Sequence, residues 1–407
     1  MVSCFISFTP ILYKGSKMRD TIIYVGGFRL PNFNASAVRV MENACLLKSL
    51  GYDVVILGKL QEVEGEIVHY AVHDGFDCYD IRQPFKNGKY APYTKSIASI
   101  EAVVKHIGTE KVKAIIAYNY PALALHKLVT YSRKNGIAPV SDCTEWYGWE
   151  GTHLLRNIRR FVDTRYRMHF SAKRAANIIC AGSYLESFFK DYNTVSWPFC
   201  VNTELERWKL SDTVAVHHPR VFVYSGSPGM GMSKDKINLI IEILYDLKLE
   251  GKNFKYIVLG ITKVQYLEHF ETHEKMIEFM GESIEFKGRV PHTEALSTLK
   301  NADFSLFIRP DTRVSHAGFP TKVMEAFTSG IPTIANATSD IPKYVKNTIN
   351  GFIFKSSDAE DIKATLLESL EMSDEALLAM KLQCREENPF AIENFKKSVG
   401  EFLDRTV

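Results

Sequence analysis

The sequence lacks the patterns that mark disulfide-bonded, zinc-binding or membrane-spanning proteins. Its seven cysteines are an odd number scattered over 407 residues, and no two of them form a C-x-x-C pair. This distribution fits free thiols in a reducing compartment and argues against a disulfide framework or a zinc site. No apolar run reaches the roughly 20 residues of a membrane-spanning helix. These absences predict a cytoplasmic protein without a spanning segment.

Charge and composition narrow the class further. The formal net charge of +3 is too small to indicate a nucleic acid or an acidic partner by itself. A hydrophobic fraction of 46% and a charged fraction of 24% are typical of a globular protein, and 407 residues suffice for two domains. No basic residue precedes the mildly apolar residues 5–13, which argues against a signal peptide. We expect residues 1–17 to be a disordered extension, or translation to begin at Met18.

The first half alternates predicted strands and helices. Residues 21–25 read as a buried strand ended by Gly26 and Gly27, residues 36–50 as a helix, and residues 53–57 as the next strand. This order opens a right-handed parallel unit of the Rossmann type. The glycines lack the G-x-G-x-x-G spacing, which argues against a dinucleotide-dependent oxidoreductase.

A further strand is predicted at residues 137–140, and polar and aromatic residues follow it. Ligands of open parallel sheets bind beyond the carboxyl ends of the strands. Asp142, Glu145 and Trp146 therefore stand where a ligand would bind, because carboxylates accept hydrogen bonds from hydroxyls and an aromatic face covers C–H groups. The alternative for Asp142 is a helix cap.

Basic and aromatic residues interleave between residues 151 and 174. Such a stretch indicates an anionic surface, either nucleic acid or phospholipid headgroups, or else a solvated helix face with stacking arginines. The residues concerned are His153, Arg156, Arg159, Arg160, Phe161, Arg165, Tyr166, Arg167, His169, Phe170, Lys173 and Arg174.

Two segments of the second half have the properties of phosphate sites. Residues 226–235 form a glycine-rich loop between a predicted strand and a helix, and Lys234 adds a positive charge to it. Pro320 suits the start of a helix over residues 320–329, ahead of which Gly318 allows a tight bend. The bare N–H groups of that helix would bind an anion.

The segment at residues 318–335, which reads GFPTKVMEAFTSGIPTIA, carries a family resemblance. It resembles the donor-binding signature of retaining glycosyltransferases of family 4. The resemblance implies an α/β protein of the GT-B fold, in which two Rossmann-like domains face each other across a cleft and a C-terminal helix crosses back to the first domain. It also implies that Glu325 grips the ribose of the donor nucleotide. The first glutamate of the family motif falls on Ala317, so a contact usually made to the donor sugar is missing.

The resemblance also assigns the remaining site residues. Lys234 matches the lysine that binds the donor diphosphate, Ser227 replaces the usual arginine, and Arg309 is expected to take over that role. We expect Lys234, Arg309 and Glu325 to be catalytic. The donor-binding set is Gly226, Ser227, Arg289, Val290, Gly318, Phe319, Pro320, Thr321, Lys322 and Glu325, and the acceptor or cleft set is Gly26, Gly27, Arg39, Asp142 and Glu145. Arg39 is equally well explained as a solvated helix arginine.

These expectations combine into one predicted enzyme. An acceptor domain at residues 18–198, joined by a terminal helix at residues 388–407, would face a donor domain at residues 199–387. It would be a hexosyltransferase that moves a sugar from a nucleotide-diphosphate sugar to a glycan or lipid-linked acceptor in cell-surface polysaccharide synthesis. No metal or other cofactor is expected, because cations replace the metal. The sequence leaves open a non-catalytic nucleotide-sugar-binding subunit and a GT-B epimerase or phosphorylase. It also leaves open peripheral contact with the inner membrane face, where the basic and aromatic residues between 151 and 174 would contact a lipid-diphosphate acceptor.

Overall fold

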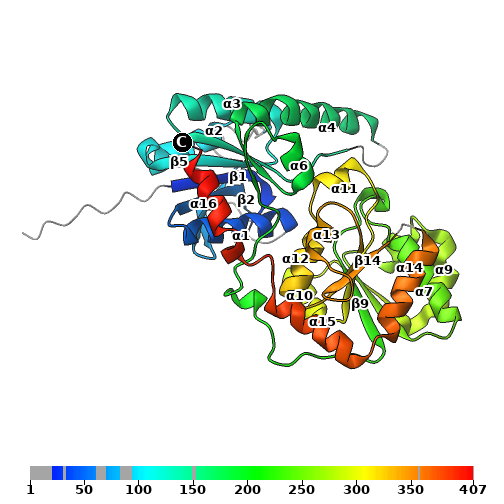
Figure 1. Ribbon diagram of the computed structural model, residues 1–407. Helices are drawn as coiled ribbons and strands as arrows, with labels where there is room; N and C mark the ends of the chain where they lie inside the picture. Colours follow the sequence, from blue (N-terminus) through cyan, green and yellow to red (C-terminus); the bar gives the residue numbers. More distant parts are fainter. Residues whose placement is uncertain are drawn as a thin grey trace, which may run out of the picture.

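The computed structural model describes residues 21–30, 34–60, 70–82, 94–148, 153–355 and 358–406. Two domains, each built on a central sheet covered by helices, lie side by side (Figure 1). The extension expected at residues 1–17 lies outside the described residues. No helix in the described ranges is both long and apolar enough to cross a membrane.

The N-terminal sheet has eight strands in the order β3-β4-β2-β1-β5-β6-β7-β8, and all neighbours are parallel except β3 and β4. Apolar residues alternate between its two faces: Ile23 and Val25 belong to one core cluster, and Ile22 and Tyr24 to the other. The strands are β1 Thr21–Arg29, β2 Asp53–Lys59, β3 Tyr70–His73, β4 Phe76–Asp80, β5 Val112–Tyr118, β6 Ala138–Cys143, β7 Asn177–Cys180 and β8 Asn193–Ser196.

The N-terminal helices pack on both faces of this sheet. They are α1 Ala35–Ser49, α2 Ala98–Ile107, α3 Ala122–Lys134, α4 Leu154–Tyr166, α5 Ala172–Ala175 and α6 Ser183–Phe188, with a π-helical turn, Arg167–Ser171, between α4 and α5. The prediction that Gly26 and Gly27 end the first strand is wrong, because β1 continues through both and Arg29 still pairs with Lys59 of β2.

The C-terminal sheet has six parallel strands in the order β11-β10-β9-β12-β13-β14. These strands are β9 Arg220–Ser225, β10 Phe254–Leu259, β11 Ile284–Gly288, β12 Phe304–Leu306, β13 Thr333–Asn336 and β14 Gly351–Phe354. Its helices are α7 Ile237–Leu249, α8 Lys263–Leu267, α9 Glu274–Met280, α10 His292–Lys300, α11 Arg313–Ala317, α12 Thr321–Thr328, α13 Ile341–Tyr344, α14 Ala359–Glu371 and α15 Asp374–Glu386. Short 3-10 turns occupy Thr109–Lys111, Glu206–Trp208, Met230–Met232, Glu271–His273, Gly281–Ser283 and Ile392–Asn394.

The chain crosses between the domains twice, and the two crossings run side by side. The Val201 N–H donates to the Phe390 carbonyl at 2.8 Å, and the Ile392 N–H donates to the Val201 carbonyl at 3.0 Å. Beyond this point α16, Lys396–Asp404, returns to the first domain, where Val399 and Phe402 join its core (Figure 1). The paired crossings hold the two sheets on either side of one cleft.

Candidate functional site

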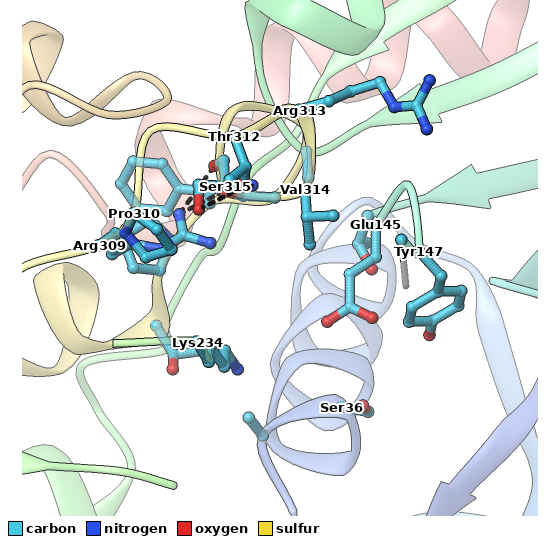
Figure 2. A pocket seen from close by; sticks show the side chains of 18 of the residues that line it. Ser36, Glu145, Tyr147, Lys234, Arg309, Pro310, Thr312, Arg313, Val314 and Ser315 are labelled. Atoms are coloured by element: carbon cyan, nitrogen blue, oxygen red, sulfur yellow. Dashed lines mark hydrogen bonds between the residues drawn. The ribbon is translucent and has the colours of Figure 1, made fainter. Parts of the chain in front are cut away.

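A cavity of about 620 Å³ lies between the domains, and side chains of both domains line it. The N-terminal domain contributes Ala35, Ser36, Tyr118, Thr144, Glu145, Tyr147, Gly148, Arg160, Ala181 and Phe199. The C-terminal domain contributes Ser233, Lys234, Arg309, Pro310, Thr312, Arg313, Val314, Ser315, Gly318, Phe319, Pro320, Thr321 and Lys322. Seven of the residues expected at the donor site therefore meet in one space. Figure 2 shows Lys234 and Glu145 extending into it from opposite domains.

Lys234 is an exposed cation at the pocket. It lies at the end of the glycine-rich loop after β9, and the Lys234 N–H donates to the Pro228 carbonyl at 2.8 Å. Gly229 has φ +83°, and a Cβ there would lie 2.9 Å from the Lys234 Cβ. The loop therefore needs glycine at this position to hold Lys234 in place.

Lys322, in the first turn of α12, forms a buried ion pair. Its Nζ lies 2.9 Å from Asp235 Oδ2, which also accepts a 2.7 Å hydrogen bond from the Tyr224 hydroxyl. Burial acts to raise the pKa of Asp235, but the Lys322 charge and these hydrogen bonds outweigh it and lower the pKa below its usual value. A Cβ at Gly226 would lie 3.0 Å from Lys322 Nζ, so the glycine makes room for the ammonium group.

Arg309 follows β12 and is buried at the pocket wall. Its Nη1 donates to the carbonyls of Ser315 at 2.9 Å and Gly318 at 2.8 Å, and the side-chain amide of Asn336 pairs with its main chain. Within the described ranges no carboxylate forms an ion pair with it, and burial lowers its pKa. A buried guanidinium held only by carbonyls retains a positive charge to offer an anion.

The N-terminus of α12 opens onto the same pocket. Pro320 is the N-cap rather than the first helical residue, and no side chain caps the helix. The first N–H groups of α12 are therefore available to an anion beside Lys234 and Arg309. We call Lys234, Arg309 and the N-terminus of α12 the cationic wall.

Glu325 lies one turn deeper in α12 and does not line the cavity. It is 9% exposed, and its Oε1 lies 3.3 Å from His292 Nε2 at the start of α10. Sequence reasoning did not select His292, although it follows Arg289 and Val290 of the predicted donor-binding set. Gly226, Ser227, Arg289 and Val290 also lie beside the cavity rather than in its lining, at the carboxyl ends of β9 and β11.

The wall of the cavity that the N-terminal domain forms differs from the prediction made for it. Glu145 lines the cavity as expected, but Asp142 and Arg39 are fully buried and face each other across 3.0 Å. The hydroxyl of Tyr24 donates to the second oxygen of Asp142. The assignment of Arg39 and Asp142 to the cleft is therefore wrong, because each neutralises the other inside the domain.

Three other residues expected in the cleft pack inside the N-terminal domain instead. Gly26 pairs with Tyr118 inside the sheet, and a Cβ there would lie 2.7 Å from the Phe28 ring. Gly27 continues the same strand, and Trp146 is buried against Phe188, with ring centroids 4.7 Å apart. None of the three belongs to the cavity lining as described.

Tyr118 and Tyr147 stand at the N-terminal wall with hydroxyl groups that sequence reasoning did not identify. Burial and the Glu145 charge raise the pKa of Tyr118 to about 12, and burial with Glu145 raises that of Tyr147 well above its usual value. Both phenols are therefore neutral hydrogen-bonding groups at physiological pH. The sequence pattern does not distinguish these two tyrosines from others, because tyrosine is also common in the cores of sheets.

The residues that the structure describes contain no group of three or more His, Cys, Asp or Glu side chains arranged to hold a metal ion. Charge in the described lining of the cavity comes from basic side chains of both domains and from Glu145.

Comparisons with known proteins find similar sequences among glycosyltransferases. Residues 225–386 match the family model described as glycosyl transferases group 1. The amylovoran biosynthesis glycosyltransferase AmsK of Erwinia amylovora is 24% identical over 91% of this chain and 97% of its own length. The putative colanic acid biosynthesis glycosyltransferase WcaL of Salmonella typhimurium is 28% identical over 38% of this chain, a match that spans 37% of WcaL.

Solved structures share the fold over nearly the whole chain. Sucrose-phosphate synthase from Thermosynechococcus elongatus superposes with a TM-score of 0.68 at 14% identity, covering 95% of this chain and 99% of that one. Anabaena HepE in complex with UDP superposes with a TM-score of 0.60 at 12% identity, covering 95% and 100%. The predicted GT-B fold is confirmed, and the chain is a glycosyltransferase.

Proposed function

We propose that this glycosyltransferase is a retaining enzyme of family 4. It would take a sugar from a nucleoside diphosphate donor to a glycan or lipid-linked acceptor in cell-surface polysaccharide synthesis. One observation carries the proposal: the cationic wall and Glu145, which belong to different domains, line a single cavity. A donor diphosphate would lie against the first and an acceptor against the second.

The cationic wall suits a departing diphosphate. As the bond between the anomeric carbon and the β-phosphate oxygen breaks, its electron pair passes to the phosphate, and the sugar gains oxocarbenium character. Lys234, Arg309 and the α12 N-terminus are in place before that charge develops, which is the condition for electrostatic stabilisation of a transition state. These groups would supply the charge that a metal supplies in other transferases, so the proposal needs no metal.

Lys322 would act differently from Lys234. Asp235 already balances its charge, so the pair contributes a dipole and a fixed position rather than a full positive charge. Its role in the proposal is to hold the first turn of α12 against the glycine-rich loop. The free energy of leaving-group stabilisation then comes mainly from Lys234 and Arg309.

The N-terminal wall suits a sugar hydroxyl. Glu145 accepts hydrogen bonds, while Ser36, Tyr118 and Tyr147 can donate and accept them. An acceptor hydroxyl held here would form the new bond to the anomeric carbon, and its proton would leave with the nucleoside diphosphate. The names of AmsK and WcaL refer to polysaccharide biosynthesis, which supports a glycan or lipid-linked acceptor. HepE contains UDP, which supports a uridine nucleotide as the first donor to test.

Turnover assays test the proposal. UDP-, GDP- and ADP-hexoses are first screened by thermal shift, because a ligand that binds only the folded chain raises its apparent stability. The stabilising donor is then incubated with oligosaccharide and polyprenyl-diphosphate-sugar acceptors, and NMR reports the anomeric configuration of the product. We expect transfer with retention that is lost in Lys234→Ala. Tight nucleotide binding without transfer or hydrolysis would instead indicate a binding subunit.

A further inference from the structure

Helix α4 has its apolar side on the outside. The two side chains of α4 that are buried, Asn157 and Thr164, are both polar. Five large apolar side chains of the helix are exposed instead: Leu154, Leu155, Ile158, Phe161 and Val162. A surface helix normally has the reverse arrangement, with its apolar stripe on the core. At 84% exposure, Leu155 is the most exposed of the five.

The exposed residues form one continuous face. At 100° per residue, positions 154, 155, 158, 161 and 162 fall within about 120° of each other on the helix surface. Asn157 and Thr164 fall on the inward side. We call these five side chains the outer face of α4. An uncovered face of this kind marks a contact with an apolar partner.

Two exposed arginines of α4 accompany the apolar residues of the outer face. In the helical projection Arg159 borders the arc of apolar residues, and Arg165 falls within that arc at the C-terminal end of the helix. The one acidic side chain of α4, Asp163, is turned inward, where its Oδ1 accepts the N–H of Ala122 at 3.0 Å and caps α3. A helix face that combines apolar residues with arginines is complementary to phospholipid, which is apolar below and anionic at the surface.

The outer face is connected to the cavity. Arg160 lines the cavity from α4, and its guanidinium lies 4.5 Å from the centroid of the Tyr147 ring. Arg167, directly after α4, donates to the Glu145 carbonyl at 2.7 Å. One short segment therefore has a lipid-compatible side and a side that supports the acceptor wall. Figure 1 shows α4 along the outer edge of the N-terminal domain.

We propose that the outer face of α4 binds the surface of an anionic lipid bilayer and thereby places the cavity next to a lipid-linked acceptor. The part about the acceptor rests on the proposed function, whereas the binding of lipid does not. The helix would lie in the headgroup region, with its apolar residues below the phosphates and Arg159 and Arg165 among them. The contact is peripheral and reversible, and it weakens as salt screens the arginines.

Flotation of the full chain with vesicles tests this proposal. We expect it to float with phosphatidylglycerol–phosphatidylethanolamine vesicles and at least tenfold less with pure phosphatidylcholine. Leu155→Glu with Val162→Glu should lower the vesicle-bound fraction at least tenfold, and Arg159→Glu with Arg165→Glu should remove most of the preference for anionic lipid. A matched control, Leu249→Glu with Val264→Glu, changes two exposed apolar residues of the C-terminal domain and should float like the wild type.

Two outcomes would overturn the proposal. One is a wild type that does not bind anionic vesicles, and the other is a Leu155→Glu, Val162→Glu chain that binds them unchanged. If that variant instead converts a dimer to a monomer in light scattering, the outer face is an interface between two copies. The thermal shift by a nucleotide sugar should be equal in all α4 variants, and Lys234→Ala should still float. A wild-type chain that binds the donor but does not float therefore refutes the lipid contact alone and leaves the proposed function standing.

Discussion

Each domain has a buried ion pair bonded to a tyrosine of its first strand, and the two pairs differ in what they face. In the N-terminal domain Tyr24 donates to Asp142, which pairs with Arg39. In the C-terminal domain Tyr224 donates to Asp235, which pairs with Lys322. A glycine follows two residues after each tyrosine.

The difference lies in access to the cleft. Lys322 borders the cavity, whereas Arg39 and Asp142 have no exposed side-chain surface. Burial acts to lower the pKa of Arg39, but the Asp142 charge and hydrogen bond, together with Tyr24 and Tyr118, outweigh it and raise the pKa, so the guanidinium stays charged. The same chemistry therefore stabilises the fold in one domain and helps to shape the cavity in the other. Residue type alone does not separate the two roles.

The largest effect should come from breaking the N-terminal pair. Asp142→Ala leaves Arg39 charged and buried without its partner, and we expect it to lower the free energy of unfolding by about 3–5 kcal/mol. Urea denaturation measures the loss. Transfer by the fraction that remains folded should stay within about threefold of the wild type, since neither residue reaches the cavity.

Replacing both partners sharpens this test. Arg39→Met with Asp142→Leu removes both charges and keeps apolar volume, and it should cost less stability than Asp142→Ala alone. If the folded double variant instead loses transfer as completely as Lys234→Ala, the pair acts on the cleft and the contrast between the two domains disappears.

The second prediction concerns the cationic wall. Lys234→Ala removes an exposed cation that has no role in the core, so the melting temperature should stay unchanged. Transfer, measured as kcat/KM, should fall at least 100-fold, or about 3 kcal/mol, as expected for loss of one preorganised group at a developing charge. Lys263→Ala, an exposed lysine at the start of α8, is the matched control. A loss of kcat/KM below fivefold would contradict the proposed contact between the donor diphosphate and Lys234.

The third prediction uses the lowered pKa of Asp235. A carboxylate whose pKa is lower in the folded state stabilises the fold above its unfolded pKa of 3.8 and loses that effect as pH falls through the folded value. Asp235→Asn should therefore cost about 2 kcal/mol at pH 7, because the amide cannot balance Lys322. The difference from wild type should persist down to about pH 4 and narrow only below it. If the difference in unfolding free energy disappears between pH 7 and pH 5, a group other than Asp235 causes it.

The sequence predicted the donor side better than the acceptor side. Pro320 and Gly318 defined the start of α12 nearly to the residue, and a glycine-rich loop located Lys234, because both features follow from local backbone chemistry. The family resemblance assigned Lys234, Arg309 and Lys322 to one site, and all three line the same cavity.

The prediction for the acceptor side failed for a physical reason. The strand-end rule placed Asp142 at the correct edge of the sheet, but only tertiary packing decides whether a side chain there turns outward like Glu145 or inward to a buried arginine. The partner, Arg39, lies more than 100 positions away, so no local pattern reveals the pair. The reversed face of α4 was also hidden, because periodicity shows an apolar stripe without showing which way it points.

The smallest predicted effect is that of a substitution that restores a missing cation. Ser227 is exposed on the glycine-rich loop, where the family resembled has an arginine, and Gly229 donates to its hydroxyl at only 3.4 Å. Ser227→Arg should lower the KM for the donor about threefold to fivefold, or up to about 1 kcal/mol, which is typical of a solvent-exposed ion pair. The kcat should change by less than about twofold, because in the proposed mechanism Arg309 stabilises the leaving group in place of the family arginine. Steady-state kinetics at low and high salt check this, since a true charge contact weakens with ionic strength. A large rise in kcat would mean that Arg309 does not replace the family arginine, and that the cationic wall of this chain is incomplete.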